Sequence, residues 1–192
     1  MCRPILSAQD AEQSATAQIQ VMDESLYRIQ RDVRQSDTNG VFLCSSDSDA
    51  VSCSQASTYT AATATSALAV LTAESNGDGP TRWDSTGHPL WSGFKVYWLS
   101  AESDGANTLY LAFEPASVSL DAEPTVLNSD AAQAVSAALA STDPFRVASD
   151  ILTLQSFADV TKDHVGLRLT GLTQDGASSG QLTVEGDAYA RN

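Results

Sequence analysis

The sequence of 192 residues predicts an α+β protein, in which a long N-terminal helix packs on an antiparallel sheet and a short second helix lies in a connection. Three observations lead to this fold class: a helical period over the first 35 residues, alternating apolar residues among turn signals after residue 40, and an alanine-rich run near residue 130. The length and a hydrophobic content of 42% agree with one domain over residues 1–192. Within that domain, we expect the helix at residues 7–38 and a β-rich globular part at residues 41–192.

The first segment has the pattern of an amphipathic helix. Its apolar residues recur every three or four positions, so they share one stripe of the helix surface. Asn39-Gly40 provides a stop, because both residues tolerate the left-handed conformation that ends helices. At 1.5 Å per residue the rod would be on the order of 40 Å long. The face expected to pack on the sheet consists of Ala15, Ile19, Met22, Leu26, Ile29 and Val33.

The remainder of the chain reads as short strands separated by Gly, Asn, Asp and Pro. The turn residues 103–107 separate two segments rich in aromatic and β-branched residues, which predicts a hairpin between them. A capping residue, Ser129 or Asp130, precedes an Ala-rich run and predicts a second helix at Ser129–Leu139. The expected strands are Val41–Cys44, Ala67–Thr72, Phe94–Leu99, Thr108–Phe113, Ile151–Phe157, His164–Thr170 and Gln181–Tyr189.

The charge of the chain limits its partners. The formal net charge is −14, which argues against binding nucleic acid through bulk charge and against an anionic membrane surface. An acidic surface of this kind suits solubility in a salty or extracellular setting. We therefore expect no nucleic-acid partner of this type.

The cysteines predict a local disulfide. Cys44 and Cys53 flank a short, acidic, serine-rich segment, so a disulfide between them can close this loop. Such a disulfide would imply an oxidising compartment. Two unrelated free thiols are the alternative. A metal site has less support, because neither His88 nor His164 stands at ligand spacing from the cysteines. Cys2 is the unpaired third cysteine.

An acidic turn raises the question of calcium. Glu74, Asn76 and Asp78 place oxygen ligands at alternate positions, as in the first half of a calcium loop. The EF-hand pattern fails, because Ser85 stands near the position where it requires a bidentate glutamate. A solvated acidic turn is the plainer interpretation, so we expect no cofactor, with calcium as the alternative.

Catalysis finds little support in the sequence. No Gly-x-Ser-x-Gly elbow is present, and Asp163-His164 reads as a polar step from a turn into a strand. Trp83 and Trp91 would make a binding patch if both were exposed, and otherwise belong to the core. We therefore expect a protein that is not an enzyme.

Several segments resemble type IV pilin-like proteins. Leu26–Ser36 has the order apolar, Arg-Asp, apolar, Arg-Gln and small residue that is often found at the end of the long helix in minor pilins and pseudopilins. The hairpin Gly93–Leu99 with Thr108–Phe113 and the late segments Val147–Phe157 and Val165–Leu169 are also similar. The chain then ends in Arg191-Asn192, as many minor pilins do. The resemblance is to W-type minor pilins of type IV pili and J-type minor pseudopilins of type II secretion.

This resemblance implies a fold and a role. Such proteins have a pilin-like fold, a long N-terminal helix on an antiparallel sheet, and the upper half of that helix is apolar and lies in the membrane before assembly. The sequence lacks that apolar half, the leader and the glutamate near the processing site, so no family functional residue maps onto it. The implied function is a subunit that primes or caps a filament for a pilus, type II secretion or DNA uptake. Its partners would be sibling subunits, and a membrane would be contacted only through the missing N-terminal segment.

The implied location is the cell envelope, periplasmic or extracellular, with an anchor in a full-length precursor. Met1-Cys2-Arg3-Pro4-Ile5-Leu6 is not a signal peptide. We expect either a trimmed chain or a start upstream of Met1. The alternative function is a free-standing secreted binding module or adhesin, which would use exposed aromatics or the acidic loop.

Overall fold

A computed structural model describes residues 3–47, 50–56, 63–64, 66–74, 79–87, 89–101, 107–120, 128–159, 164–175 and 178–189. The chain begins with helix α1, Arg3–Gln35, and a 3₁₀ turn, Thr38–Gly40, that Asp37 caps by accepting from the Asn39 amide. The second helix is α2, Asn128–Leu139. The strands are β1 (Val41–Asp47), β2 (Ala50–Gln55), β3 (Thr63–Ala64), β4 (Ala67–Thr72), β5 (Trp91–Ala101), β6 (Asn107–Leu120), β7 (Phe145–Asp159), β8 (His164–Asp175) and β9 (Ser178–Tyr189).

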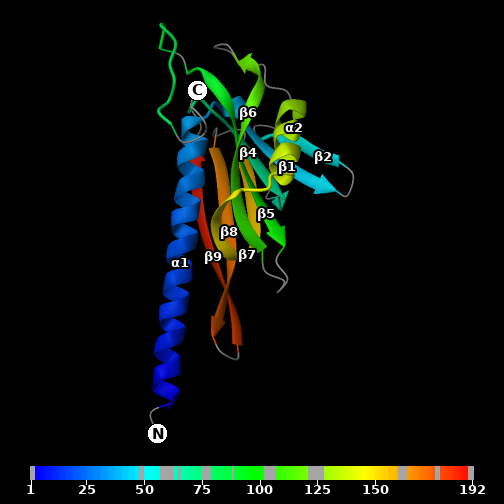
Figure 1. The fold of residues 1–192 in the computed structure, drawn as a ribbon. Coiled ribbons are helices and arrows are strands. Elements are labelled where there is room, and N and C mark those ends of the chain that lie inside the picture. The colour runs from blue at the N-terminus through cyan, green and yellow to red at the C-terminus, as the bar shows by residue number, and fades with distance from the viewer. Residues whose placement is uncertain are drawn as a thin grey trace.

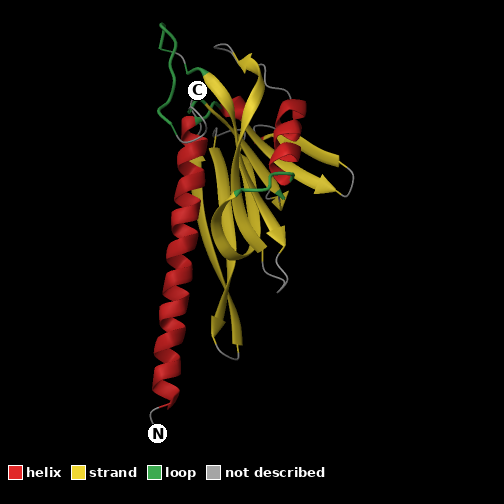
Figure 2. Cartoon of the chain, in the orientation of Figure 1, coloured by secondary structure: helices red, strands yellow, loops and turns green. Residues whose placement is uncertain are grey.

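All the strands belong to one antiparallel sheet that curls along its length (Figures 1 and 2). Eight strands follow each other in the order β2-β1-β4-β5-β6-β7-β8-β9, and β3 pairs with β7. Most neighbours in the sheet are also neighbours in sequence, as is usual for antiparallel sheets. The predicted hairpin is the pair β5–β6, in which Trp98 lies opposite Tyr110.

The predicted α+β fold class, with its pilin-like layout, is wrong. Among the described residues, 57% lie in strands and 30% in helices, and the architecture is a curled antiparallel sheet with one long and one short helix. Serine- and threonine-rich segments contain few apolar residues, so the sequence pattern specifies strands in them only weakly. β2, for example, runs through such a segment, since backbone pairing requires no apolar side chain.

Two apolar cores lie on the two faces of the sheet. Alternate residues of β4 contribute to each: Leu68 and Val70 face the core that contains α1, and Ala69 and Leu71 face the core that contains α2. Every residue of β4 is therefore buried. In Figure 1, α1 runs along β9 and β8, and its N-terminal turns extend past the described ends of these strands.

Neither helix among the described residues is long and apolar enough to cross a lipid bilayer.

Candidate functional site

Helix α1 packs on the sheet over only part of its length. Met22, Ile29 and Val33 are 0% exposed and Leu26 is 6% exposed, so the C-terminal half of the predicted packing face lies in the core. Ala15, about two turns before Met22, is half-buried, and Ile19 is 39% exposed. The apolar stripe thus continues along the helix beyond the point where the sheet covers it.

Two glycines let the helix approach the sheet closely. A Cβ added at Gly171 of β8 would collide with the sulfur of Met22, and one at Gly186 of β9 would collide with the amide of Gln30. The absence of side chains at these strand positions leaves the space that the helix occupies. These contacts fix the height of α1 above β8 and β9.

Polar side chains of α1 anchor both ends of the docked segment. Gln18 Nε2 donates to the carbonyl oxygens of Ser149, at 3.2 Å, and Asp150, at 3.5 Å. Asp150 has a φ of 60°, a left-handed conformation that aspartate tolerates better than most residues. Near the other end, Gln30 Nε2 and Arg34 donate to the carbonyl oxygen of Asp187, at 3.3 and 3.4 Å.

A buried ionic cluster joins the end of α1 to the centre of the sheet. We call Asp32, Glu74, Lys95 and Tyr97 the Lys95 cluster. Lys95 Nζ lies 3.0 Å from Asp32 Oδ1 and 2.6 Å from Glu74 Oε2, and the hydroxyl of Tyr97 donates to Asp32 Oδ2 at 2.6 Å. Arg31 supplies a second positive charge to Asp32 at 3.0 Å from a half-exposed position. Two carboxylates therefore face two cations.

The Lys95 cluster is sealed from solvent. Lys95 is 2% exposed, Asp32 3% and Tyr97 0%, so a dissolved substrate would not reach these groups. Burial raises the pKa of the Tyr97 phenol well above its usual range, and the neighbouring charge and hydrogen bond of Asp32 raise it further. The phenol thus stays neutral and acts as a hydrogen-bond donor. This arrangement fits a clamp between helix and sheet better than a catalytic centre.

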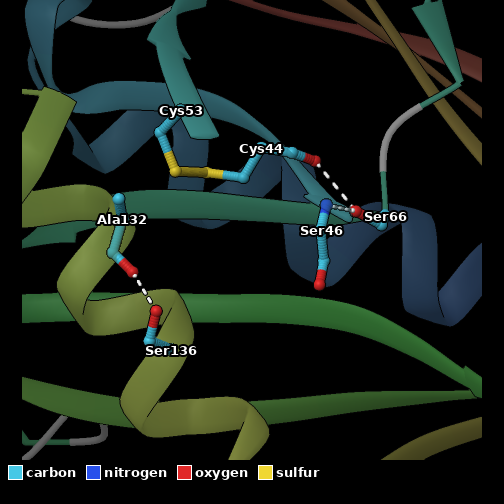
Figure 3. The surroundings of a disulfide bond; sticks show 6 residues. All are labelled: Cys44, Ser46, Cys53, Ser66, Ala132 and Ser136. Carbon is cyan, nitrogen blue, oxygen red and sulfur yellow. Dashed lines mark hydrogen bonds between the residues drawn. A yellow bond between two sulfur atoms is a disulfide. The ribbon is translucent and has the colours of Figure 1, made fainter. Parts of the chain in front are cut away.

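The predicted disulfide is present. Cys44 of β1 and Cys53 of β2 are directly opposite in the register, with Cα atoms 4.1 Å apart, and their sulfurs are bonded. Figure 3 shows the bond beside Ser66, whose hydroxyl accepts from the Ser46 amide at 2.8 Å and donates to the Cys44 carbonyl at 3.2 Å. Helix α2 lies alongside, where Ser136 donates to the carbonyl of Ala132. Both cysteines are buried in the core that α2 covers.

Only one of the candidate calcium ligands, Glu74, lies in the described residues, and it is engaged elsewhere. Glu74 turns its carboxylate to Lys95 in the buried cluster, while Asn76 and Asp78 lie outside the described residues. Within the part of the chain that the structure describes, no three His, Cys, Asp or Glu residues are grouped so that they could hold a metal ion.

Trp83 and Trp91 are not exposed together, so the condition for an aromatic patch is not met. Trp83 is 49% exposed, but Trp91 is 8% exposed and packs in the core beneath α2. His88 lies outside the described residues, and for His164 only the backbone, at the start of β8, is described.

The sequence analysis missed the Lys95 cluster, although a signal was present. Lys95 interrupts an otherwise apolar and aromatic strand, and Asp32 adjoins the apolar stripe of α1. One base and one acid at positions expected to be buried indicate that they pair, because an unpaired buried charge is costly.

No protein-family model, curated protein or solved structure matches this chain.

Proposed function

We propose that this chain is a non-catalytic subunit of a type IV pilus-like filament in the cell envelope, a minor pilin or pseudopilin that joins sibling subunits. The proposal follows from the sequence resemblance, and one structural observation supports it. That observation is the incomplete docking of α1, which leaves the N-terminal part of the predicted packing face uncovered by the chain's own sheet.

The uncovered segment has the properties of a helix that needs a partner. From Glu12 to Val21 no side chain is buried, yet Ala15 and Ile19 continue the apolar stripe. Most of the stability of a helix in a protein comes from packing of its apolar face rather than from intrinsic propensity. A sibling subunit that covered this stripe would supply the missing packing, as helices do for each other in the core of a filament.

The inaccessible Lys95 cluster favours an assembly role over catalysis. Its charges satisfy each other and hold the C-terminal half of α1 on the sheet. A firmly held half would orient the other half toward its partners. The alternative, a secreted binding module, needs an exposed aromatic pair or an open acidic loop, and neither Trp91 nor Glu74 is placed for that use.

Site-specific crosslinking in the organism that carries the gene tests the proposal. A photo-reactive amino acid replaces Ile19 on the uncovered stripe, and a matched control replaces Ser141, which is exposed in the loop after α2. We expect Ile19 to crosslink to a pilin-like subunit that mass spectrometry identifies, whereas Ser141 does not. We also expect deletion of the gene to impair piliation, secretion or DNA uptake. Failure of Ile19 to crosslink to any such subunit, with these functions intact in the deletion strain, would overturn the proposal.

A further inference from the structure

We propose that the outward face of α1 binds a second copy of this chain, with the two α1 helices antiparallel. This inference is independent of the filament role, because it concerns the side of the helix that points away from the docked stripe. The interface, here called the Tyr27 face, consists of Gln20, Asp23, Glu24, Tyr27, Arg31 and Arg34.

The Tyr27 face is a continuous strip. At 100° per residue, its six members fall within an arc of about 100° on the side of the helix opposite Met22 and Ile29. All six are exposed, and Tyr27, at 64%, is the most exposed of the large hydrophobic side chains in the described residues. In the view of Figure 1, the middle turns of α1 have no other described element on the side away from the sheet. Tyrosine and arginine, both present on this face, are among the residue types that dominate the energetics of protein interfaces.

The order of charges along this face selects the occupant. Acidic residues, Asp23 and Glu24, come before Tyr27, and basic residues, Arg31 and Arg34, come after it. If two copies pack antiparallel about a point midway between Tyr27 and Arg28, Glu24 of each lies opposite Arg31 of the other, and the contact is made twice. A parallel arrangement would bring like charges together. The face is therefore complementary to itself, as a two-fold symmetric interface requires.

The charged side chains are already held in place. Gln20 Nε2 donates to Glu24 Oε1 at 3.1 Å, and Arg31 is fixed by Asp32 while keeping a side-chain exposure of 45%. Arg34 is tied to the carbonyl of Asp187. Side chains ordered before binding lose less conformational entropy on association.

Basic residues are scarce elsewhere. The chain has ten, and three of them, Arg28, Arg31 and Arg34, occur within seven residues of α1, against a net charge of −14. Two copies repel each other at long range, but at physiological salt the Debye length is about 8 Å, so contacts at the interface outweigh distant charges. The association is therefore best measured at that ionic strength.

Sedimentation equilibrium of the full chain, as a function of concentration, tests the pairing with charge-swapped variants. Glu24→Arg and Arg31→Glu each place like charges opposite each other twice in a homodimer, and we expect each to raise the dissociation constant at least about tenfold. An equimolar mixture of the two variants restores both attractive contacts and should associate as the wild type does. Gln133→Arg, a charge change at an exposed position of α2 on the opposite face of the sheet, is the control and should leave association unchanged.

Arg31 contacts the buried Asp32, so a substitution at Arg31 can affect folding as well as association. A second substitution, at Tyr27, separates the two effects. Tyr27→Ala removes only an exposed side chain and should also weaken association at least about tenfold, with an unchanged unfolding temperature. A wild-type chain that stays monomeric at every concentration would overturn the inference. So would single variants that associate like the wild type, or a mixture that does not recover. None of these outcomes bears on crosslinking at Ile19, so the two proposals fail separately.

Discussion

The two halves of α1 have the same apolar period but different surroundings. From Met22 to Val33 the stripe is buried, two glycines of the sheet make room for it, and a buried ionic cluster fastens its end. From Glu12 to Val21 no apolar side chain of the same period is buried and Ile19 stays exposed, although Gln18 donates to carbonyl oxygens of β7. The difference teaches that periodicity specifies which face of a helix can pack, whereas the partner's surface decides how far it does pack.

The largest expected effect comes from breaking the Lys95 cluster. Lys95→Met leaves Asp32 and Glu74 buried without their shared cation, so it should lower the free energy of unfolding by about 3–5 kcal/mol. The combined variant Asp32→Asn, Glu74→Gln and Lys95→Met removes all three charges and should lose less than Lys95→Met alone. Urea denaturation measures both. An equal or greater loss in the combined variant would mean that the cluster is not held by its charges.

A matched pair of isoleucines compares the two halves directly. Ile29→Ala creates a cavity in the core and should cost about 2–5 kcal/mol. Ile19→Ala removes the same atoms from an exposed position and should change stability by less than about 1 kcal/mol. Thermal and urea unfolding of the two variants measure the difference. Similar losses at both positions would show that the sheet also supports the N-terminal half.

Features of the fold and the site that depend on local sequence could be predicted, whereas those that depend on tertiary contacts could not. The C-terminal half of the buried stripe of α1 and the pairing of Cys44 with Cys53 followed from local spacing. The strands were foreseen in part: Ala67–Thr72 is exact, most others were expected too short, and β2 and β3 were missed. The exposure of Ile19 could not be foreseen, because it depends on how closely the sheet follows the helix beyond Met22. Likewise, the sequence signals that Asp32 and Lys95 are both buried, but only the docking of α1 on the sheet shows that they pair. The fold class was wrong because short strands such as β2, where only Val51 and Cys53 alternate on the core side, give too brief a pattern to be recognised.

The disulfide separates the stability of the sheet from the docking of the helix. Cys53→Ser should cost about 2–3 kcal/mol under oxidising conditions and little in reductant, since the bond acts mainly on the unfolded chain. Because the bond lies in the core on the α2 side, the Ile29→Ala and Cys53→Ser losses should add. Denaturation with and without reductant tests this. An equal loss under both conditions would show that Cys53 contributes only packing.

The smallest effect is confined to alkaline pH. The pKa of Tyr97 is raised in the folded chain by burial and by Asp32, so folding favours the neutral phenol. Its contribution is fully present below its unfolded pKa, near 10, and is lost as the pH rises through the folded value. Stability of the wild type should therefore fall more steeply above pH 10 than that of Tyr97→Phe, while the two profiles run parallel between pH 6 and 9. Parallel profiles throughout would contradict a protected phenol.

The most direct test of the account is hydrogen exchange along α1, measured by NMR or mass spectrometry on the full chain. Amides from Met22 to Val33 should exchange with a protection close to that of global unfolding, and amides from Gln13 to Ile19 should exchange orders of magnitude faster. That contrast is the result predicted for a helix docked over one half. Uniform protection from Gln13 to Val33 would show that the whole helix is held, and would contradict the half-docked helix on which the proposed assembly role depends.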